Sequence, residues 1–156
     1  MIQRIQTIWL FLASVALFGL FFLPTLQLSN TDGVARSIRL TGAYDTAGAQ
    51  VVQAQSFILL TVVGVIVALI PLVLIFFYKN RKQQMAFCYL TIVAILAFSF
   101  WLAQTAKNVA GNVEPGIQNF GIGAVLPSLA VIFMILAAKG IRNDQKLVRS
   151  ADRLRG

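Results

Sequence analysis

Four long runs of apolar residues, separated by polar segments, dominate the sequence. The runs cover residues 5–23, 56–78, 85–104 and 116–138, and none of them contains Asp, Glu, Lys, Arg or His. Each run reaches the length of about 20 apolar residues that a membrane-spanning helix requires. The pattern therefore predicts an all-α membrane protein whose residues 1–138 form a four-transmembrane-helix bundle.

The longest polar segment, residues 24–55, separates the first two runs and has a hydrophobic pattern of its own. Two short stretches alternate apolar and polar residues, and residues 30–33 between them have the Asn-Thr-Asp-Gly composition of a tight turn. We therefore predict a small β-hairpin in this external loop. Its apolar positions are Leu26, Leu28, Ile38 and Leu40.

The connection between the third and fourth runs, residues 105–115, is the other external loop. An isolated hairpin is only marginally stable in water, so we expect the hairpin to pack on this loop or on a partner surface. The same arrangement brings Glu114 near Arg36 or Arg39.

Two of the runs contain an internal proline, Pro71 in the second and Pro127 in the fourth. A proline within a helix removes one backbone hydrogen bond and can bend the helix, so both positions are predicted kinks. Ordinary packing of membrane helices accommodates such prolines, and a gating role for them is the open alternative.

Three pairs of small residues, spaced four apart, fall within the runs. Such pairs let helices approach each other closely in lipid, either within one bundle or between two copies of the chain. The pairs are Gly64 with Ala68, Ser99 with Ala103, and Ala124 with Ser128.

The chain changes character after the fourth run, because residues 139–156 combine a helical apolar stripe with many basic residues. We predict a cytoplasmic basic amphipathic helix, which either lies on the anionic inner leaflet of the lipid bilayer or docks on a protein partner. Asp144 is expected to stabilise the N-terminal end of that helix through its dipole. Nucleic acid is not an expected partner, since this segment lacks aromatic residues for base stacking. The residues expected to contact lipid or a partner are Arg142, Lys146, Arg149, Arg153 and Arg155.

The basic residues are distributed unevenly among the polar segments, and this asymmetry predicts the orientation. Lys and Arg in short loops tend to remain in the cytoplasm. Ten of the 13 basic residues fall on the side that carries both termini, while Arg36, Arg39 and Lys107 fall on the other. The predicted location is therefore the bacterial inner membrane, with multiple passes and both termini cytoplasmic.

Groups able to carry out catalysis are scarce in this sequence. It contains no histidine and a single cysteine, Cys88, and no Asp or Glu falls within the four runs. Metal, haem and histidine-based acid–base chemistry need such groups gathered in one place. We therefore expect no enzyme active site, no cofactor and no metal site. Small four-helix drug exporters depend on a glutamate in their first helix, whereas the polar residues of the first run here are the neutral Gln6, Thr7 and Ser14. The sequence therefore argues against such an exporter.

Both ends of the chain resemble those of one protein family. Residues 1–7 lead directly into the first run, and the order of residues from 141 to 155 is the more specific of the two motifs. Together with the chain length and the number of runs, these ends resemble a family of uncharacterised four-pass inner-membrane proteins of Bacteroidota-type bacteria, catalogued as a domain of unknown function. The resemblance implies localisation and topology, but no activity.

Two functions of different classes fit these expectations. The first is an accessory or scaffolding subunit of a membrane assembly, which presents the hairpin and the basic helix to a membrane-protein partner or to a second copy of the chain. The second is a small carrier or lipid-handling protein for a neutral or amphiphilic solute. It would use the two proline positions and a cavity in a dimer, and a neutral cavity that opens between the second and fourth helices would favour it.

Overall fold

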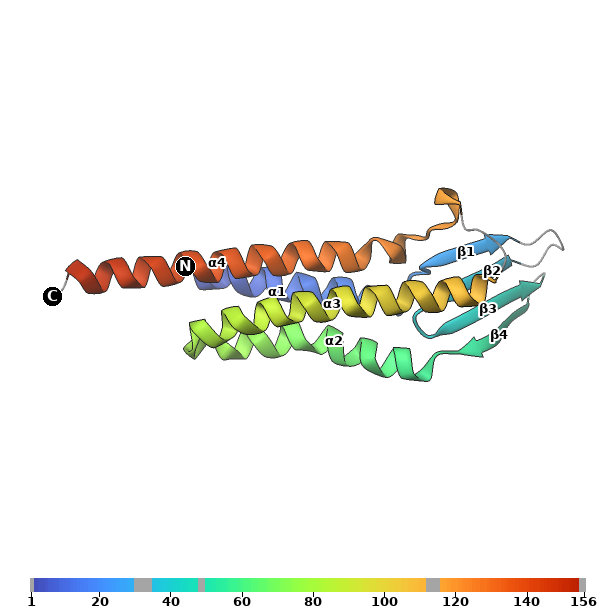
Figure 1. The fold of residues 1–156 in the computed structure, drawn as a ribbon, viewed down its shortest axis with the longest axis horizontal. Coiled ribbons are helices and arrows are strands. Elements are labelled where there is room, and N and C mark those ends of the chain that lie inside the picture. The colour runs from blue at the N-terminus through green and yellow to red at the C-terminus, as the bar shows by residue number, and fades with distance from the viewer. Residues whose placement is uncertain (1, 30–34, 48–49, 112–115, 155–156) are drawn as a thin grey trace.

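Four helices run along the long axis of the molecule, and a small β-sheet caps one end of them (Figure 1). The structure is a computed structural model that describes residues 2–29, 35–47, 50–111 and 116–154. The predicted four-helix arrangement is therefore present, although the molecule also contains more β-structure than one hairpin. The helices are α1 (Ile2–Gly19), α2 (Ile58–Phe76), α3 (Arg81–Ala110) and α4 (Leu126–Leu154).

The sheet has four antiparallel strands in the order β1-β2-β3-β4. The predicted hairpin is confirmed, because β1 pairs with β2 and Leu26 lies opposite Ile38. The third and fourth strands were not predicted. Every residue of β4 is exposed, so this strand lacks the alternation that revealed the first two. The strands are β1 (Leu26–Ser29), β2 (Ala35–Arg39), β3 (Gly42–Ala47) and β4 (Gln50–Ser56).

The sheet rests on the last turns of α3. Leu26, Leu28 and Ile38 form a buried cluster with Ala106 and Ala110. The segment that the sequence suggested as a loop from residue 105 therefore continues α3 as far as Ala110. The hairpin packs on this helical extension rather than on a loop, and burial of its apolar face stabilises strands that would be marginal alone.

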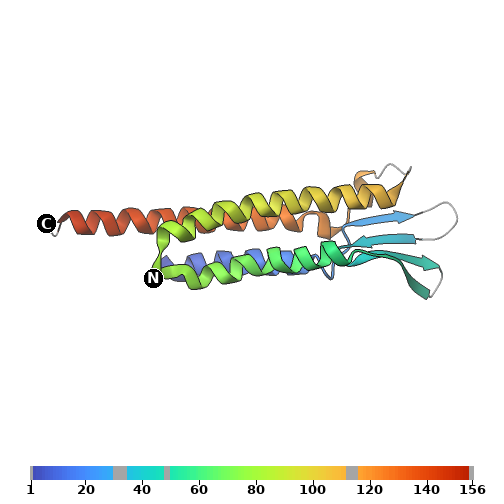
Figure 2. The same ribbon diagram turned by 60° about the horizontal axis from the view of Figure 1, so that its bottom comes forward.

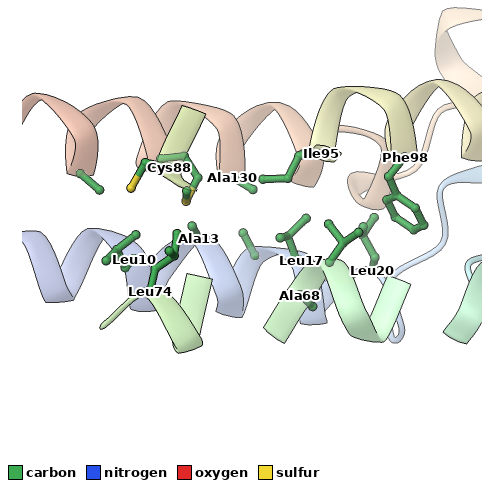
Figure 3. Packing of buried hydrophobic residues seen from close by; sticks show 14 of the residues in the cluster. Leu10, Ala13, Leu17, Leu20, Ala68, Leu74, Cys88, Ile95, Phe98 and Ala130 are labelled. Carbon is green, nitrogen blue, oxygen red and sulfur yellow. The ribbon is translucent and has the colours of Figure 1, made fainter. Parts of the chain in front are cut away.

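The helices pack as a bundle in which α1 contacts α2 and α4, and α3 contacts the same two neighbours. Figure 2 shows this arrangement from a second direction. Side chains from all four helices meet along the centre, and Figure 3 shows Leu10 and Leu17 of α1 facing Ile95 of α3 and Ala130 of α4. The core is therefore shared by all four helices.

The outward faces of the helices are strongly apolar. Ile58, Phe76 and Leu90, for example, are more than 60% exposed, at 73%, 77% and 63%. Apolar side chains that face outward along helices of this length are covered by lipid. Among the described residues, three segments are long and apolar enough to cross a membrane, and the apolar part of α1 is shorter. The three are Ile58–Phe76, Arg81–Ala110 and Ile122–Leu147.

The fourth helix begins later than the apolar run predicted. Residues 116–125 instead contain two short 3₁₀ turns, η2 (Ile117–Asn119) and η3 (Ile122–Ala124). The N–H of Gly123 donates to the carbonyl of Pro24 at 3.0 Å, and that of Gly121 donates to Thr25 at the same distance. A Cβ at position 123 would lie 2.7 Å from the Pro24 oxygen, so glycine permits this close approach. The backbone therefore closes against the end of α1 before α4 starts.

The two prolines occupy different helical positions. Pro71 lies inside α2, as predicted, and is buried. Pro127 is the second residue of α4, where an N–H has no intrahelical partner in any case. The prediction of an interior kink at Pro127 is therefore wrong, because the helix starts only one residue before it.

Candidate functional site

A groove of about 790 Å³ lies between α3 and α4, next to the sheet. Its wall is mostly apolar and includes Leu96 and Leu102 of α3 together with Val131 and Ile132 of α4. Thr25, Leu26 at the start of β1, and Phe120 line its end nearest the sheet.

Small residues on the two facing helices create the groove. Ser99 and Ala103 line it from α3, while Ala124 and Ser128 line it from the side of α4. Two of the three small-residue pairs thus border a hollow instead of a tight helix contact. The third pair behaves as expected, since Gly64 and Ala68 are buried in the bundle. A cavity between the second and fourth helices was the observation that would favour a carrier, and this groove lies between α3 and α4 instead.

Lys107 provides the charge at the end of the groove nearest the sheet. The hydroxyl groups of Thr25, Ser99 and Ser128 add neutral polarity to the wall. Ser99 donates its hydroxyl to the carbonyl of Ile95 at 2.6 Å, which satisfies that group within α3. The groove can therefore hold an apolar chain with a polar or anionic head next to Lys107.

The opposite end of the bundle contains an ion pair between helices. Arg81 at the start of α3 contacts Asp144 of α4 through Nη1 and Oδ2, which are 2.9 Å apart. The Asp144 side chain is 7% exposed. Asp144 was expected to begin a separate tail helix, but it lies well inside α4 and attaches that helix to α3. Arg81 was counted only as one of the basic residues that set orientation.

A second, smaller pocket of about 260 Å³ lies beside this ion pair. It is lined by Arg81, Gln84 and Tyr78 together with Gln6 of α1. Gln84 donates through Nε2 to the carbonyl of Leu74 at 3.0 Å. Gln6 is buried, and its Nε2 has no hydrogen-bond partner in the described part of the chain. The spacing of Arg81 and Gln84 places both on one helical face, but only the tertiary fold brings Gln6 to them.

The basic residues predicted to contact lipid or a partner lie along the end of α4. Arg142 and Lys146 are exposed, and Arg149 and Arg153 continue the same helix. Arg155 lies outside the described residues. Both views show this end of α4 extending beyond the other three helices, on the side away from the sheet (Figures 1 and 2). The segment therefore continues the axis of α4 as one uninterrupted helix.

At the end of the molecule opposite the Arg81–Asp144 pair, charged side chains of the sheet contact one another and a tyrosine ring. Arg36 of β2 and Asp45 of β3 form a two-point contact, with bonds of 2.6 and 2.8 Å from Nε and Nη2. The hydrogen bond from Arg36 holds the pKa of Asp45 below its usual value, and the same bond raises the pKa of Arg36. Arg39 lies over the ring of Tyr44, 5.4 Å from its centre. Arg36 thus pairs across the sheet, and Glu114 lies outside the described residues.

The described residues do not bring together three His, Cys, Asp or Glu side chains that could hold a metal ion. The polar atoms that do gather are amides, hydroxyls, arginines and single carboxylates. These groups are suited to binding through hydrogen bonds and charge.

The apolar outer faces and the three long helices define a multi-pass membrane protein with a small antiparallel sheet at one end. Residues 2–154 match a family described as a domain of unknown function (DUF4293), and the chain belongs to that family. No curated protein matches the sequence. The expected membership in a domain-of-unknown-function family is thus confirmed over nearly the whole chain.

Proposed function

We propose that this protein is an accessory or scaffolding subunit of a bacterial inner-membrane assembly. In this proposal the chain crosses the membrane four times and has both termini in the cytoplasm. The projecting end of α4 docks on a cytoplasmic part of a partner, and the external sheet faces the other side of the membrane. The protein itself catalyses no reaction.

The straight course of α4 supports this proposal. A basic helix that serves only to lie on the inner leaflet would turn into the membrane plane, whereas α4 runs from Leu126 to Leu154 without interruption. The Arg81–Asp144 ion pair holds α4 against α3 up to the point where α4 leaves the bundle. Leu147 is 55% exposed and lies among basic residues toward the end of α4, and that end extends beyond the other three helices (Figure 1). Such a helix gains stability when a partner covers its apolar side.

The proposed topology has two supports. Arg81 and Asp144 lie at the end of the bundle where the basic residues gather, and the positive-inside tendency assigns this end to the cytoplasm. The fourth crossing is α1, whose apolar part, Ile5–Gly19, spans about 22 Å at the rise of an α-helix. The hydrocarbon core is about 30 Å thick, so the turn that follows α1 completes the crossing.

A crosslinking experiment in the native membrane tests the proposed role. The tagged protein is crosslinked, solubilised gently and analysed by mass spectrometry for proteins recovered at constant stoichiometry. A variant with Lys146, Arg149 and Arg153 changed to Gln is compared with a control in which Lys79, Lys82 and Lys139 are changed to Gln. Both variants lose three positive charges on the same side of the bundle.

We expect the partner to be lost from the first variant and retained by the control. A shorter chain that ends at Gln145 keeps Asp144 and should behave like the first variant. Recovery of the same partner with all three variants would contradict docking through α4. Recovery of the protein with lipid alone would contradict the scaffolding role.

The groove between α3 and α4 favours a second function, the handling of a lipid or another amphiphile. Its apolar wall and the single charge of Lys107 match a molecule with an apolar chain and an anionic head. The test fills the groove by Ala103→Leu and compares it with Ala97→Leu, an exposed position of α3 outside the groove. Loss of a co-purified amphiphile from the first variant alone would support this function, and equal recovery from both would contradict it.

A further inference from the structure

We propose that the pocket beside the Arg81–Asp144 ion pair is a binding site for a phosphate group. This site is separate from the groove and from the projecting end of α4. The pocket is formed where the start of α1, the end of α2 and the first turn of α3 meet, and its volume is about 260 Å³. A phosphate with part of the group that it esterifies fits into this space.

The unpartnered amide of Gln6 is the observation on which this inference depends. Gln6 is 6% exposed, lines the pocket, and has no hydrogen-bond partner for Nε2 in the described part of the chain. A buried donor without a partner is destabilising, and such groups are rare unless something else satisfies them. Gly140 of α4 fits against Gln6, since a Cβ there would lie 2.9 Å from the Gln6 Cγ. The packing thus holds the amide at the pocket wall.

The other polar groups around the pocket are also hydrogen-bond donors. Arg81 contacts Asp144 through one nitrogen, Nη1, and a guanidinium carries five N–H donors in all. Tyr78 contributes a hydroxyl group. Gln84 already donates to the carbonyl of Leu74, which fixes the wall on that side. Arg81 is the charged residue that lines the pocket, and its guanidinium has donors and no acceptor, so the expected ligand is an anionic acceptor with several oxygens.

The first turn of α3 adds a favourable field for an anion. Asn80 caps this helix without a side-chain hydrogen bond, and no acidic residue lies in the first turn. The N-terminus of a helix has unpaired N–H groups and a partial positive charge, which favour phosphate. Arg81 and Gln84 of the same turn line the pocket, so the helix start and the buried amide act on one ligand. A phosphate oxyanion satisfies both.

The phosphate can come from the headgroup of a membrane lipid or from free phosphate. Ile75 and Phe76 supply apolar wall next to the donors, which suits the glycerol ester of a lipid headgroup. The two sources share the same chemistry at Gln6 and Arg81, and the measurement below distinguishes them.

Isothermal titration calorimetry on the purified full chain in mild detergent tests the site with three probes. These are dioctanoyl phosphatidic acid, inorganic phosphate, and dioctanoylglycerol, which has the same chains without phosphate. The variants are Gln6→Leu, which removes the donor, and Gln6→Glu, which keeps the size and adds a negative charge. The control is Gln83→Leu, an exposed position in the same turn of α3. A thermal melt of each variant shows that it is folded.

We expect saturable binding of phosphatidic acid at one site. Gln6→Leu should weaken it at least about tenfold, Gln6→Glu should weaken it further, and the control should match the unaltered protein. Binding of inorganic phosphate with the same dependence on Gln6 identifies the free ion as a sufficient ligand, and binding of phosphatidic acid alone identifies the lipid. Unchanged affinity in both Gln6 variants, equal binding of dioctanoylglycerol, or no saturable binding would overturn the proposal.

Discussion

The hydroxyl of Ser14 in α1 donates a hydrogen bond to the carbonyl oxygen of Ala68 in α2, with 2.7 Å between the two oxygens. Two other hydroxyls in the bundle bond within their own helix, Thr91 to Phe87 and Ser99 to Ile95. Ser14 instead joins two helices one turn before Pro71, where the proline removes a bond from the ladder of α2. The contact therefore attaches α1 to the part of α2 that has lost a backbone bond.

Removal of this interhelical bond should destabilise the bundle. We expect Ser14→Ala to lower the free energy of unfolding by roughly 1 kcal/mol, since hydrogen bonds between membrane helices have about this strength. Thermal unfolding in mild detergent, followed by circular dichroism, measures the change. The matched control is Ser99→Ala, which removes a bond within one helix and should have a smaller effect. Equal losses in the two variants would show that the Ser14 contact has no special role.

Gly64 lies where α2 meets both the sheet and α3. A Cβ at this position would be 2.8 Å from Cδ2 of Leu40 and 3.1 Å from Cζ of Phe98. We expect Gly64→Val to destabilise the protein by about 1–3 kcal/mol, as overpacked cores do. Gly116→Val is the control, because the nearest atom to a Cβ there is Cγ of Gln118 at 3.8 Å. A melting temperature unchanged by Gly64→Val would contradict the tight packing at this junction.

The ion pair between Arg81 and Asp144 should stabilise the junction of α3 and α4. Arg81→Gln leaves a carboxylate that is 7% exposed without its partner, and such a loss costs several kcal/mol, about 3–5 where both charges are buried. The double variant Arg81→Gln with Asp144→Asn removes both charges and should recover part of that loss. The free energy of unfolding of each variant, measured in the same detergent, shows whether the double variant recovers stability. A double variant less stable than Arg81→Gln alone would be inconsistent with a direct pair.

The Arg36–Asp45 pair should make the sheet sensitive to acid. Because the pKa of Asp45 is lowered in the folded protein, chiefly by the hydrogen bond from Arg36, the pair stabilises the sheet above about pH 4, the ordinary range of an aspartate. The contribution is lost as the pH falls through the lowered pKa. Both side chains are partly exposed, so the effect is modest, within about 1 kcal/mol.

Hydrogen exchange of the strand amides measures this effect by comparing the protein with Asp45→Asn at each pH. The variant should exchange faster at pH 7, and the difference should shrink as the pH drops below about 4. A difference that does not change with pH would mean that the charge of Asp45 does not stabilise the sheet.

The sequence pattern predicts the long helices and the first hairpin because each has a single dominant period. Leu26, Leu28 and Ile38 alternate with polar residues and are buried in the sheet. The strand β4 has no such signal, because both of its faces are exposed. Strands of this kind are formed by pairing with a neighbour, which periodicity does not report.

The start of α4 and the pocket around Gln6 depend on contacts between distant residues. Residues 116–125 contain no charged side chain and therefore joined the predicted fourth span, but the backbone of Gly123 lies close to Pro24 and α4 starts only at Leu126. Gln6 and Arg81 are 75 positions apart in the chain, and one polar residue in an apolar run gives no indication of its neighbour. The ion pair of Arg81 has the same origin, since Asp144 reaches it only through the packing of α4 on α3.

The most direct test of the proposed arrangement asks on which side of the membrane the sheet and the end of α4 lie. Cys88 is the only cysteine and is buried, so Cys88→Ala provides a background for single cysteines at Gln53 of β4 and Lys146 of α4. Spheroplasts are treated with a maleimide that does not cross membranes. We predict labelling of Gln53→Cys in intact spheroplasts and of Lys146→Cys only after permeabilisation. Labelling of both positions from the same side would contradict the four-pass arrangement and, with it, the cytoplasmic docking role of α4.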